Sequence, residues 1–426
     1  MATLGKMWKN IDLRKRILFT LLIFVVYRVG SYIPVPMINT TVLGAMINTS
    51  ALGFIDALSG GALKRFSLFA MSISPYITAS IVIQLLQMDV IPTLSEWAKE
   101  GETGKRKLNQ LTRYMALVLA FIQSITMAIG FNLMYGGILL QSHSIWAYIY
   151  IAIVMTAGTA VLLFLADQIT SKGIGNGTSM IIVAGIVSRL PVMIGDLYTY
   201  YLSDITLTNV LAAISIIALL VLTIIAVVYL QNATRKIPIQ YANRHNAAQL
   251  SGRKDSFIPL RLNSAGVIPV IFAVSLVSLP LTIVSFFPES GVTNVLQAVF
   301  DYTRPIGFIL YVALIIGFTY FYAFVQVSPE KVAENLKKQG SYIPGVRPGV
   351  DTEEYLSKVL SRITFIGAIY LVIIACLPIL LGILTDLPPS IQIGGTSLLI
   401  VVGVAIETAK QIQTKTMDQK YQGFIR

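Results

Sequence analysis

The run Val210-Leu-Ala-Ala-Ile-Ser-Ile-Ile-Ala-Leu-Leu-Val-Leu-Thr-Ile-Ile-Ala-Val-Val-Tyr-Leu230 contains no charged residue, and it decides the class of fold. A helix of this length crosses the hydrocarbon core of a bilayer, which is about 30 Å thick. Residues 306–325 form a second run of the same kind. Over all 426 residues, 55% are hydrophobic and only 12% are charged, whereas about 25% is usual for a soluble domain. The sequence therefore predicts an integral membrane protein built of α-helices.

Ten apolar runs are candidates for membrane-spanning helices. They are residues 17–33, 68–88, 114–133, 145–165, 179–194, 210–230, 265–287, 306–325, 363–384 and 391–406. The fifth and the tenth are short and follow glycines. The first run follows basic residues as a secretory signal does, but no small-residue cleavage site follows closely, so we expect it to remain as a span. The predicted fold is an all-α membrane protein of ten transmembrane helices in two halves, residues 1–200 and 201–426. An odd number of spans in each half would invert the second half relative to the first.

The basic residues between these runs predict the orientation of the chain. Of the 32 Lys and Arg residues, all but five fall on the side of the N-terminus when the spans alternate in direction. The five exceptions are Arg28, Lys64, Arg65, Arg189 and Arg304. Because cytoplasmic loops carry the excess of positive charge, we expect both termini in the cytoplasm and the chain in the cytoplasmic membrane.

Residues 51–63, between the first two runs, are apolar but too short to cross a bilayer. Backbone that is not helical is tolerated at membrane depth only inside protein or beside a water-filled cavity. Gly60-Gly61 provides a flexible break, so a short re-entrant helix fits this segment. A helix lying on the outer membrane surface is the alternative that the pattern leaves open. Ser72-Ile-Ser-Pro-Tyr76 is a second interruption, and it predicts that the next helix begins inside the protein.

The membrane interior lacks the groups that ion-coupled transport or catalysis would need. Arg28 and Arg189 lie near outer ends of spans, whereas Asp167 and Glu407 lie near cytoplasmic ends, so we expect all four to be interfacial. No Ser/His/Asp or Cys/His arrangement shares one depth, so we expect no enzyme. His143, His245 and Cys376 are scattered, and we expect neither a metal nor a cofactor. Without a phosphate-binding loop, the energy for any transport must come from a partner.

Two long basic loops, residues 231–262 and 328–361, contain turn residues that predict ordered structure. Proline and glycine flank Arg347, which should hold its guanidinium on a rigid tip. Arginine at such a tip suits phosphate or carboxylate contacts. Charge alone does not separate a docking site from an ordinary solvated loop.

Eight short motifs, in this order along the chain, identify a resemblance to the SecY family, the channel subunits of bacterial protein translocases. They are Ile33-Pro-Val-Pro36, Gly60-Gly-Ala-Leu63, Pro75-Tyr-Ile-Thr-Ala-Ser80, Gly101-Glu-Thr-Gly-Lys-Arg-Lys107, Gly173-Ile-Gly-Asn-Gly177, Ala265-Gly-Val-Ile-Pro269, Gly345-Val-Arg-Pro-Gly349 and Gly394-Gly-Thr-Ser-Leu-Leu-Ile400. The resemblance covers essentially the whole chain.

The resemblance implies an hourglass of two five-helix halves around a central pore, closed by an apolar ring and a plug helix. Carried over residue by residue, the ring is Ile73, Ile77, Thr178, Ile182, Ile271 and Ile400. A ring of branched aliphatic side chains repels water and ions but offers no hydrogen bond to a passing chain. Thr178 departs from the usual aliphatic residue. The plug is residues 54–63, with Phe54, Ile55, Asp56, Ala57, Leu58 and Leu63 as its named members.

The resemblance also implies a lateral gate, a seam between the second and third spans on one side and the seventh and eighth on the other. Its polar residues are Thr78, Gln84, Gln123, Asn263, Ser275 and Ser278. Polar contacts between helices in lipid contribute only about 0.6–2 kcal/mol each, so an apolar signal sequence could replace them. Some of these side chains, the serines above all, could instead bond to their own helix.

In the basic loops, Arg244 and Arg347 match family positions that contact the ribosome or the ATPase motor SecA, and the sequence does not rank these two partners. The function implied is a gated protein-conducting channel that passes unfolded polypeptides and releases membrane segments into the lipid bilayer. Its expected partners are SecE-like and SecG-like small membrane subunits, a SecA-like motor, the ribosome and signal peptides. The alternatives are a secondary transporter of a small solute and a membrane insertase or scaffold without a through-pore.

Overall fold

The computed structural model describes residues 10–39, 56, 59–88, 90–134, 137–140, 144–201, 206–241, 256–284, 291–385 and 389–422. Each of the ten predicted spans coincides with a helix in this part of the chain. The ten helices are α2 (Ile11–Gly30), α5 (Ser74–Leu86), α7 (Glu102–Met134), α8 (Ile145–Lys172), α9 (Gly177–Tyr201), α10 (Leu207–Asn232), α11 (Ile268–Val284), α13 (Pro305–Val327), α15 (Val350–Thr385) and α16 (Pro389–Gln422).

The second span starts later than predicted. Residues 68–73 form turns, and α5 begins only at Ser74, with Pro75 in its first turn. Proline is favoured there because the first N–H groups of a helix have no partner within the helix. Ile73, the residue before the helix, is fully buried. The expectation that this helix begins inside the protein is therefore confirmed, while the predicted start at residue 68 is wrong.

The fifth and tenth spans are longer than the short runs predicted. Helix α9 continues beyond residue 194 to Tyr201, and it contains Pro191. Helix α16 continues through a polar stretch to Gln422, well past residue 406. Hydropathy locates only the apolar part of a helix. The predicted C-terminal ends of α9 and α16 are therefore too early, because polar residues continue each helix.

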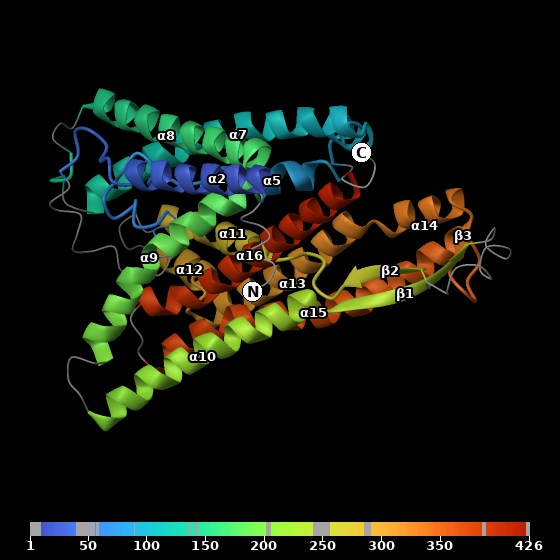
Figure 1. Ribbon diagram of the computed structural model, residues 1–426. Helices are drawn as coiled ribbons and strands as arrows, with labels where there is room; N and C mark the ends of the chain where they lie inside the picture. The colour runs from blue at the N-terminus through green and yellow to red at the C-terminus, as the bar shows by residue number, and fades with distance from the viewer. Residues whose placement is uncertain are drawn as a thin grey trace.

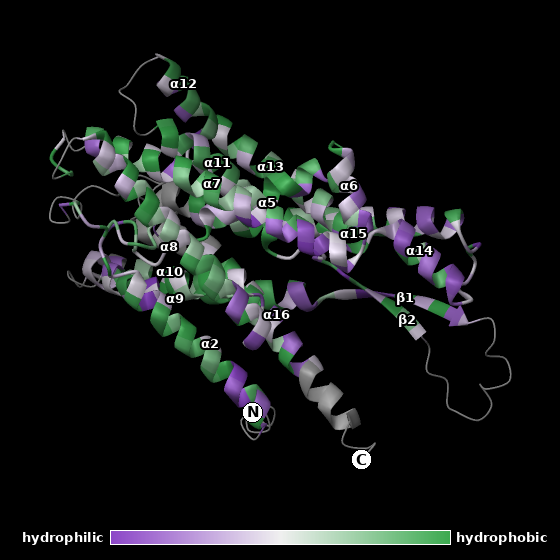
Figure 2. Ribbon diagram, turned by 90° about the horizontal axis from the view of Figure 1, so that it is seen from above, coloured by the Kyte–Doolittle hydropathy of each residue, from purple (hydrophilic) through white to green (hydrophobic). Residues whose placement is uncertain are grey.

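In the described part of the chain, six helices are long and apolar enough to cross a membrane, namely α7, α8, α9, α10, α13 and α15. Helices α5 and α11 are shorter but apolar, as is α12 (Gly291–Phe300). The remaining short helices are α6 (Pro92–Lys99) and α14 (Pro329–Lys338). In Figure 2, hydrophobic residues dominate the helical bundle, and hydrophilic residues gather on α14 and at the start of α2.

The helices pack in two groups that follow chain order (Figure 1). Helix α8 packs against α2, α7 and α9, and α5 packs against α7. In the second group, α13 and α15 pack together, α15 and α10 contact α16, and α11 contacts α13. The groups meet where α9 contacts α10 and α16, and where α11 contacts α5 and α7.

A small sheet extends from one end of the bundle (Figure 1). Its strands β1 (Thr234–Tyr241), β2 (Ser256–Arg261) and β3 (Ser341–Tyr342) have the order β2-β1-β3, and both pairings are antiparallel. Apolar side chains of the sheet, including Ile237 and Leu260, pack with Leu356 and Ile363 of α15. The prediction that the two long basic loops form ordered structure is thus confirmed for their described residues.

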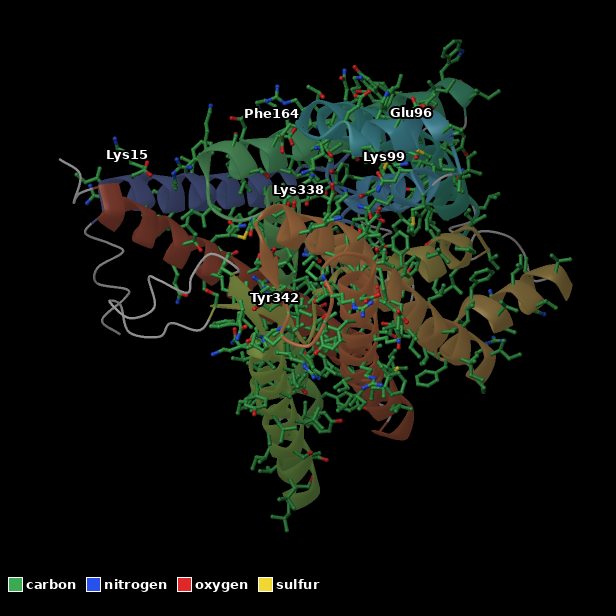
Figure 3. All side chains as sticks on the ribbon, turned by 90° about the vertical axis from the view of Figure 1, so that its right-hand side faces the viewer. Lys15, Glu96, Lys99, Phe164, Lys338 and Tyr342 are labelled. Atoms are coloured by element: carbon green, nitrogen blue, oxygen red, sulfur yellow. The ribbon has the colours of Figure 1, made fainter. Side chains whose placement is uncertain are left out.

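This end of the molecule also carries many of the lysines. Figure 3 looks onto it and shows Lys15 of α2, Lys99 of α6 and Lys338 of α14. We call it the basic end, and we call the opposite end, which carries Arg28, Asp56 and Arg189, the far end.

Candidate functional site

The isoleucines of the predicted ring are all buried. Ile73, Ile77, Ile182, Ile271 and Ile400 are each at most 7% exposed, and all five belong to one apolar cluster. They come from α5 and the residue before it, α9, α11 and α16, so they join helices of both packing groups. All five therefore lie in the same large apolar interior, which also contains residues such as Tyr311 and Leu371, and we refer to these five residues as the isoleucine cluster. Their role as a pore ring stays a prediction.

Thr178, the sixth predicted ring residue, has a different environment. It lies in the first turn of α9 and is half-buried. Its backbone N–H and its hydroxyl both donate to Asn176 Oδ1, at 3.1 and 2.8 Å. Such bonding is typical of a helix N-terminus, where the first N–H groups need side-chain acceptors. The hydroxyl is thus satisfied by its own turn rather than exposed as a bare polar group among the isoleucines.

Of the predicted plug residues, Phe54, Ile55, Ala57 and Leu58 lie outside the described residues, and Asp56 and Leu63 lie within them. Leu63 is fully buried in a second apolar cluster together with Phe66, Phe131 and Met155. Asp56 is also fully buried. The segment is thus packed inside the protein at Asp56 and at Leu63, which disfavours the alternative of a helix lying on the outer surface.

Asp56 is paired with Arg189 of α9. The distance from Arg189 Nη1 to Asp56 Oδ2 is 2.7 Å, and Asp56 Oδ1 accepts the backbone N–H of Lys64 at 3.0 Å. Arg189 is only 9% exposed. The expectation that Arg189 is an interfacial residue is therefore wrong: a carboxylate from a distant segment allows its charge to be buried.

Arg28 is likewise bound to protein. Its Nη1 donates to the carbonyl of Gly60 at 2.9 Å and to Ser188 Oγ at 3.1 Å. The neighbouring Tyr27 hydroxyl donates to the carbonyl of Ser59 at 2.9 Å. The sequence did not predict the roles of Tyr27 and Ser188. The charge of Arg28 in an apolar span was the one feature that could have pointed to this place.

At the basic end, Asp167 is partly exposed, as expected, and pairs with Arg113 of α7 at 2.8 Å. Glu407 is exposed, also as expected.

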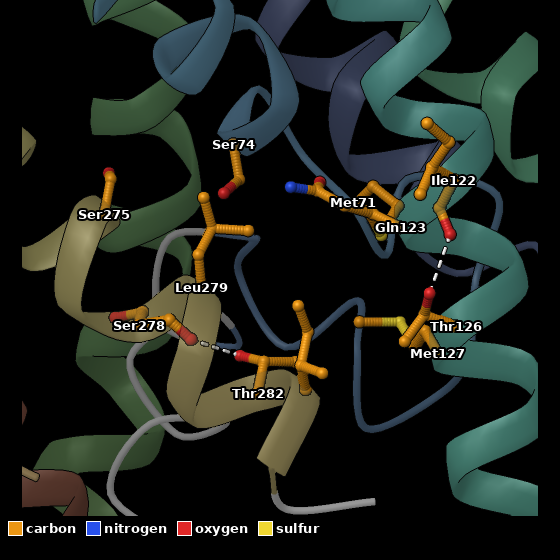
Figure 4. A pocket seen from close by; sticks show the side chains of 11 residues that line it. Met71, Ser74, Ile122, Gln123, Thr126, Met127, Ser275, Ser278, Leu279 and Thr282 are labelled. Carbon is orange, nitrogen blue, oxygen red and sulfur yellow. Dashed lines mark hydrogen bonds between the residues drawn. The ribbon is translucent and has the colours of Figure 1, made fainter. Parts of the chain in front are cut away.

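Helix α11 packs against both α5 and α7, so helices assigned to the two sides of the predicted lateral gate meet in a seam. The role of this seam as a gate stays a prediction. A pocket opens along it, and Figure 4 shows Gln123, Ser275 and Ser278 among its lining residues. The other lining residues are largely apolar, such as Met71, Ile122 and Leu279. The Ser278 hydroxyl is buried without a hydrogen-bond partner. This seam therefore combines an apolar groove with few polar contacts.

Gln84 of α5 makes a polar contact with α13, the other helix on the far side of the predicted gate. The hydroxyl of Tyr322 on α13 donates to Gln84 Oε1, while Gln84 Nε2 donates to Ser80 Oγ on its own helix. Thr78 instead bonds back to the Ser74 carbonyl of α5. The sequence missed Tyr322, since one tyrosine among many on an apolar span gives no signal of its own.

Asn263 does not lie on a span, and this corrects its placement. It occupies the turn between β2 and α11, where Asn263 Nδ2 donates to the Gly266 carbonyl at 2.9 Å. A polar cavity opens there at the basic end, lined among others by Asn176, Arg261, Glu407 and Lys410. Burial and the nearby Arg261 guanidinium lower the pKa of Lys410, against a smaller opposing effect of Glu407. The cavity is thus polar and carries charges of both signs.

Of the two predicted docking residues, Arg244 lies outside the described residues. Arg347 is exposed on a turn in which Gly345 and Gly349 have φ angles of +83° and +110°. Its backbone carbonyl accepts the Thr352 hydroxyl at 2.7 Å, which fixes the turn to the start of α15. The predicted rigid tip is therefore present at Arg347.

A bundle of apolar helices of spanning length, with a buried segment between α2 and α5 that is paired with α9, is the architecture of a multi-pass membrane protein. The family model for SecY matches residues 67–409. The chain belongs to the SecY family.

Curated relatives match along the whole chain. The protein translocase subunit SecY of Bacillus licheniformis is 50% identical over 427 residues, covering 100% of this chain and 99% of the relative. Its counterpart from Bacillus subtilis is 50% identical over 428 residues with the same coverage. The Staphylococcus aureus subunit is 49% identical over 426 residues, covering 99% of each.

Solved structures share the fold at low sequence identity. A structure described as a protein-conducting channel has a TM-score of 0.64 and 18% identity, and covers 96% of this chain and 94% of its own. Sec61 in the canine ribosome-channel complex has a TM-score of 0.62, 17% identity and the same coverage. The predicted ten-helix channel fold is confirmed. Family membership also confirms the predictions of a protein-conducting channel and of a chain that is not an enzyme, and nothing supports the small-solute transporter.

Proposed function

We propose that this chain forms the pore through which unfolded polypeptides cross the cytoplasmic membrane, and from which apolar segments leave sideways into lipid. Its two halves would be residues 1–200 and 201–426, enclosing the pore between them. The observation that carries the proposal is the meeting of Ile73, Ile77, Ile182, Ile271 and Ile400 in one buried apolar cluster that joins helices of both packing groups.

This isoleucine cluster suits the constriction of such a pore. Branched aliphatic side chains exclude water and ions when the pore is closed. They offer no hydrogen-bonding group that would hold a polypeptide in transit. Thr178, in the first turn of α9, would stand at the edge of the constriction that faces the basic end rather than within it.

The seam between α5 and α7 on one side and α11 and α13 on the other suits the lateral exit. Its pocket is largely apolar, and the Gln84–Tyr322 contact is of the weak kind that polar pairs make in lipid. An apolar signal sequence would replace these contacts at little cost. The pocket beside Gln123, Ser275 and Ser278 is where such a segment would first contact the protein.

The basic end is proposed to face the cytoplasm, with both termini, because positive residues are retained on that side. Its exposed Arg347 would bind a phosphate-rich surface such as ribosomal RNA, or acidic residues of an ATPase motor. Similar channels are known in ribosome-bound form, Sec61 in the canine ribosome-channel complex and the yeast Ssh1 complex on the 80S ribosome. SecE-like and SecG-like subunits would cover the exposed apolar faces of helices such as α10, where Leu222 is 64% exposed.

Ion conductance in planar bilayers tests the proposal, with the purified chain and its small membrane subunits. The wild type should be tight, and deletion of residues 54–63 should leak ions. If neither form conducts under any condition, the chain has no through-pore, and a scaffold or insertase would take its place.

A further inference from the structure

The far end of the molecule contains a buried ion pair between Asp56 and Arg189. Asp56 is fully buried, and both of its carboxylate oxygens are bound, one by Arg189 Nη1 and the other by the Lys64 N–H. The two charged residues are separated by 133 positions in the sequence. An ion pair in such an environment is stable only while both partners are in place, because removing one leaves an uncompensated buried charge.

A second cation holds the same segment from another helix. Arg28 of α2 donates to the Gly60 carbonyl and also to Ser188 Oγ of α9. The Tyr27 hydroxyl binds the Ser59 carbonyl. Asp56, Ser59 and Gly60 therefore lie between α2 and α9, with one arginine from each helix bound to this group.

The close approach to α9 requires the glycine at position 60. Gly60 has a φ angle of +68°, and a Cβ atom there would lie 2.5 Å from Ser188 Oγ and 3.1 Å from the Gly185 carbonyl oxygen. Gly61 also has a positive φ, of +84°, but a Cβ atom there would meet no atom within 4 Å. The segment is thus fitted against α9 at Gly60 specifically.

We propose that Arg189 and Arg28 are positioning residues that latch the plug in its closed place, with the Asp56–Arg189 pair as the principal latch. This inference rests on the proposed channel function. In the closed channel the two charges satisfy each other away from water. When the plug leaves, the widened pore admits water, which hydrates both separated charges. The latch therefore opposes spontaneous opening in a dry pore and releases once a polypeptide has opened and wetted it.

A double-mutant cycle on ion leak through planar bilayers tests this latch, with the chain in complex with its small membrane subunits. Asp56→Asn and Arg189→Gln should each raise the leak about tenfold or more, because each leaves one charge unpaired. The double variant should leak less than either single variant, since it buries no unpaired charge. Lys64→Gln is the matched control: it removes a neighbouring positive charge but keeps the backbone N–H that binds Asp56, and it should remain as tight as wild type.

A second readout follows the plug directly. Ser59→Cys places a thiol at a fully buried position. A membrane-impermeant maleimide should label this thiol slowly while the Asp56–Arg189 pair is intact, and rapidly when Asp56→Asn is added. If a neutral variant does not accumulate, Asp56→Glu and Arg189→Lys keep the charges but displace them, and they should leak to an intermediate degree.

The proposed latch is wrong if the single variants leak no more ions than wild type. It is also wrong if the increases in leak of the single variants simply add in the double variant. Deletion of residues 54–63 separates this outcome from a failure of the channel itself. If the deletion leaks while the single variants stay tight, only the latch is wrong; if the deletion does not leak either, the proposed function fails with it.

Discussion

The two regions that we propose to move during transport are held in different ways. The plug segment is fixed by charge, through Asp56–Arg189 and through Arg28 bound to the Gly60 carbonyl. The seam of α5 and α7 against α11 and α13 is held largely by apolar packing, with Gln84–Tyr322 as a polar contact between α5 and α13 and the Ser278 hydroxyl of α11 left without a partner. We infer that the two regions are released by different means. Water hydrates the separated charges of the plug segment, whereas an apolar segment replaces the apolar contacts of the seam.

The largest difference is expected from two adjacent glycines of the plug segment. Gly60→Ala and Gly61→Ala both place a side chain in the left-handed region, at a cost of about 1–2 kcal/mol. Only Gly60→Ala also collides with Ser188 and Gly185 of α9. We expect Gly60→Ala to raise the ion leak by about tenfold more than Gly61→Ala, since about 1.4 kcal/mol corresponds to a factor of ten. Equal leaks from the two variants would show that the plug segment is not packed closely against α9 at Gly60.

A middle-sized effect is expected at the seam. Tyr322→Phe removes the hydroxyl that binds Gln84, a contact worth about 0.6–2 kcal/mol between helices in lipid. The variant should translocate substrates with weak signal sequences several-fold better, measured in proteoliposomes with the motor, while its ion leak should stay near that of wild type. Tyr320→Phe on the same helix is the matched control and should change neither quantity.

Gln84→Leu should have the same effect as Tyr322→Phe, whereas Asn263→Leu should not, because Asn263 lies in the turn before α11. Unchanged selectivity in both Gln84→Leu and Tyr322→Phe would show that this contact does not govern the lateral exit.

The smallest effect is expected where an ion pair is exposed. Arg113 and Asp167 are separated by 2.8 Å, but their side chains are 49% and 41% exposed. Arg113→Gln should lower the free energy of unfolding by about 0–1 kcal/mol, and the effect should vanish in high salt. Thermal unfolding of the purified complex measures this. If Arg113→Gln lowered the free energy of unfolding as much as Arg189→Gln does, the pairing of charges by itself, rather than their burial, would determine how strongly an ion pair stabilises the protein.

The sequence predicted most of the architecture because hydropathy and loop charge report directly on the membrane. Helices such as α10 and α13 are apolar over the length of a span, so their positions follow from composition alone. The prediction failed where polar residues extend a helix, as in α9 beyond residue 194 and α16 beyond residue 406. Asn263 was assigned to the gate helices through the family resemblance, although it precedes the apolar run 265–287, and it lies in the turn before α11.

The latch could not be predicted, although both of its charges were visible. Arg189 was interpreted as an interfacial residue, and Asp56 was named only as a plug residue implied by the family resemblance, so the two were never considered together. Only the tertiary fold brings α9 to the plug segment. Tyr322 was missed for a related reason: whether a tyrosine on an apolar helix faces lipid or a partner depends on packing that a single sequence does not contain.

Photocrosslinking to a polypeptide arrested during translocation tests the central claim, that substrate passes through the isoleucine cluster. A photoreactive side chain at Ile77, Ile182 or Ile271 should crosslink to the arrested chain. The same group at Leu222 of α10, which is 64% exposed on the outside of the bundle, should not. Crosslinks at Leu222 with none at the three isoleucines would contradict the account, because the polypeptide would then pass along the outer surface rather than through the pore.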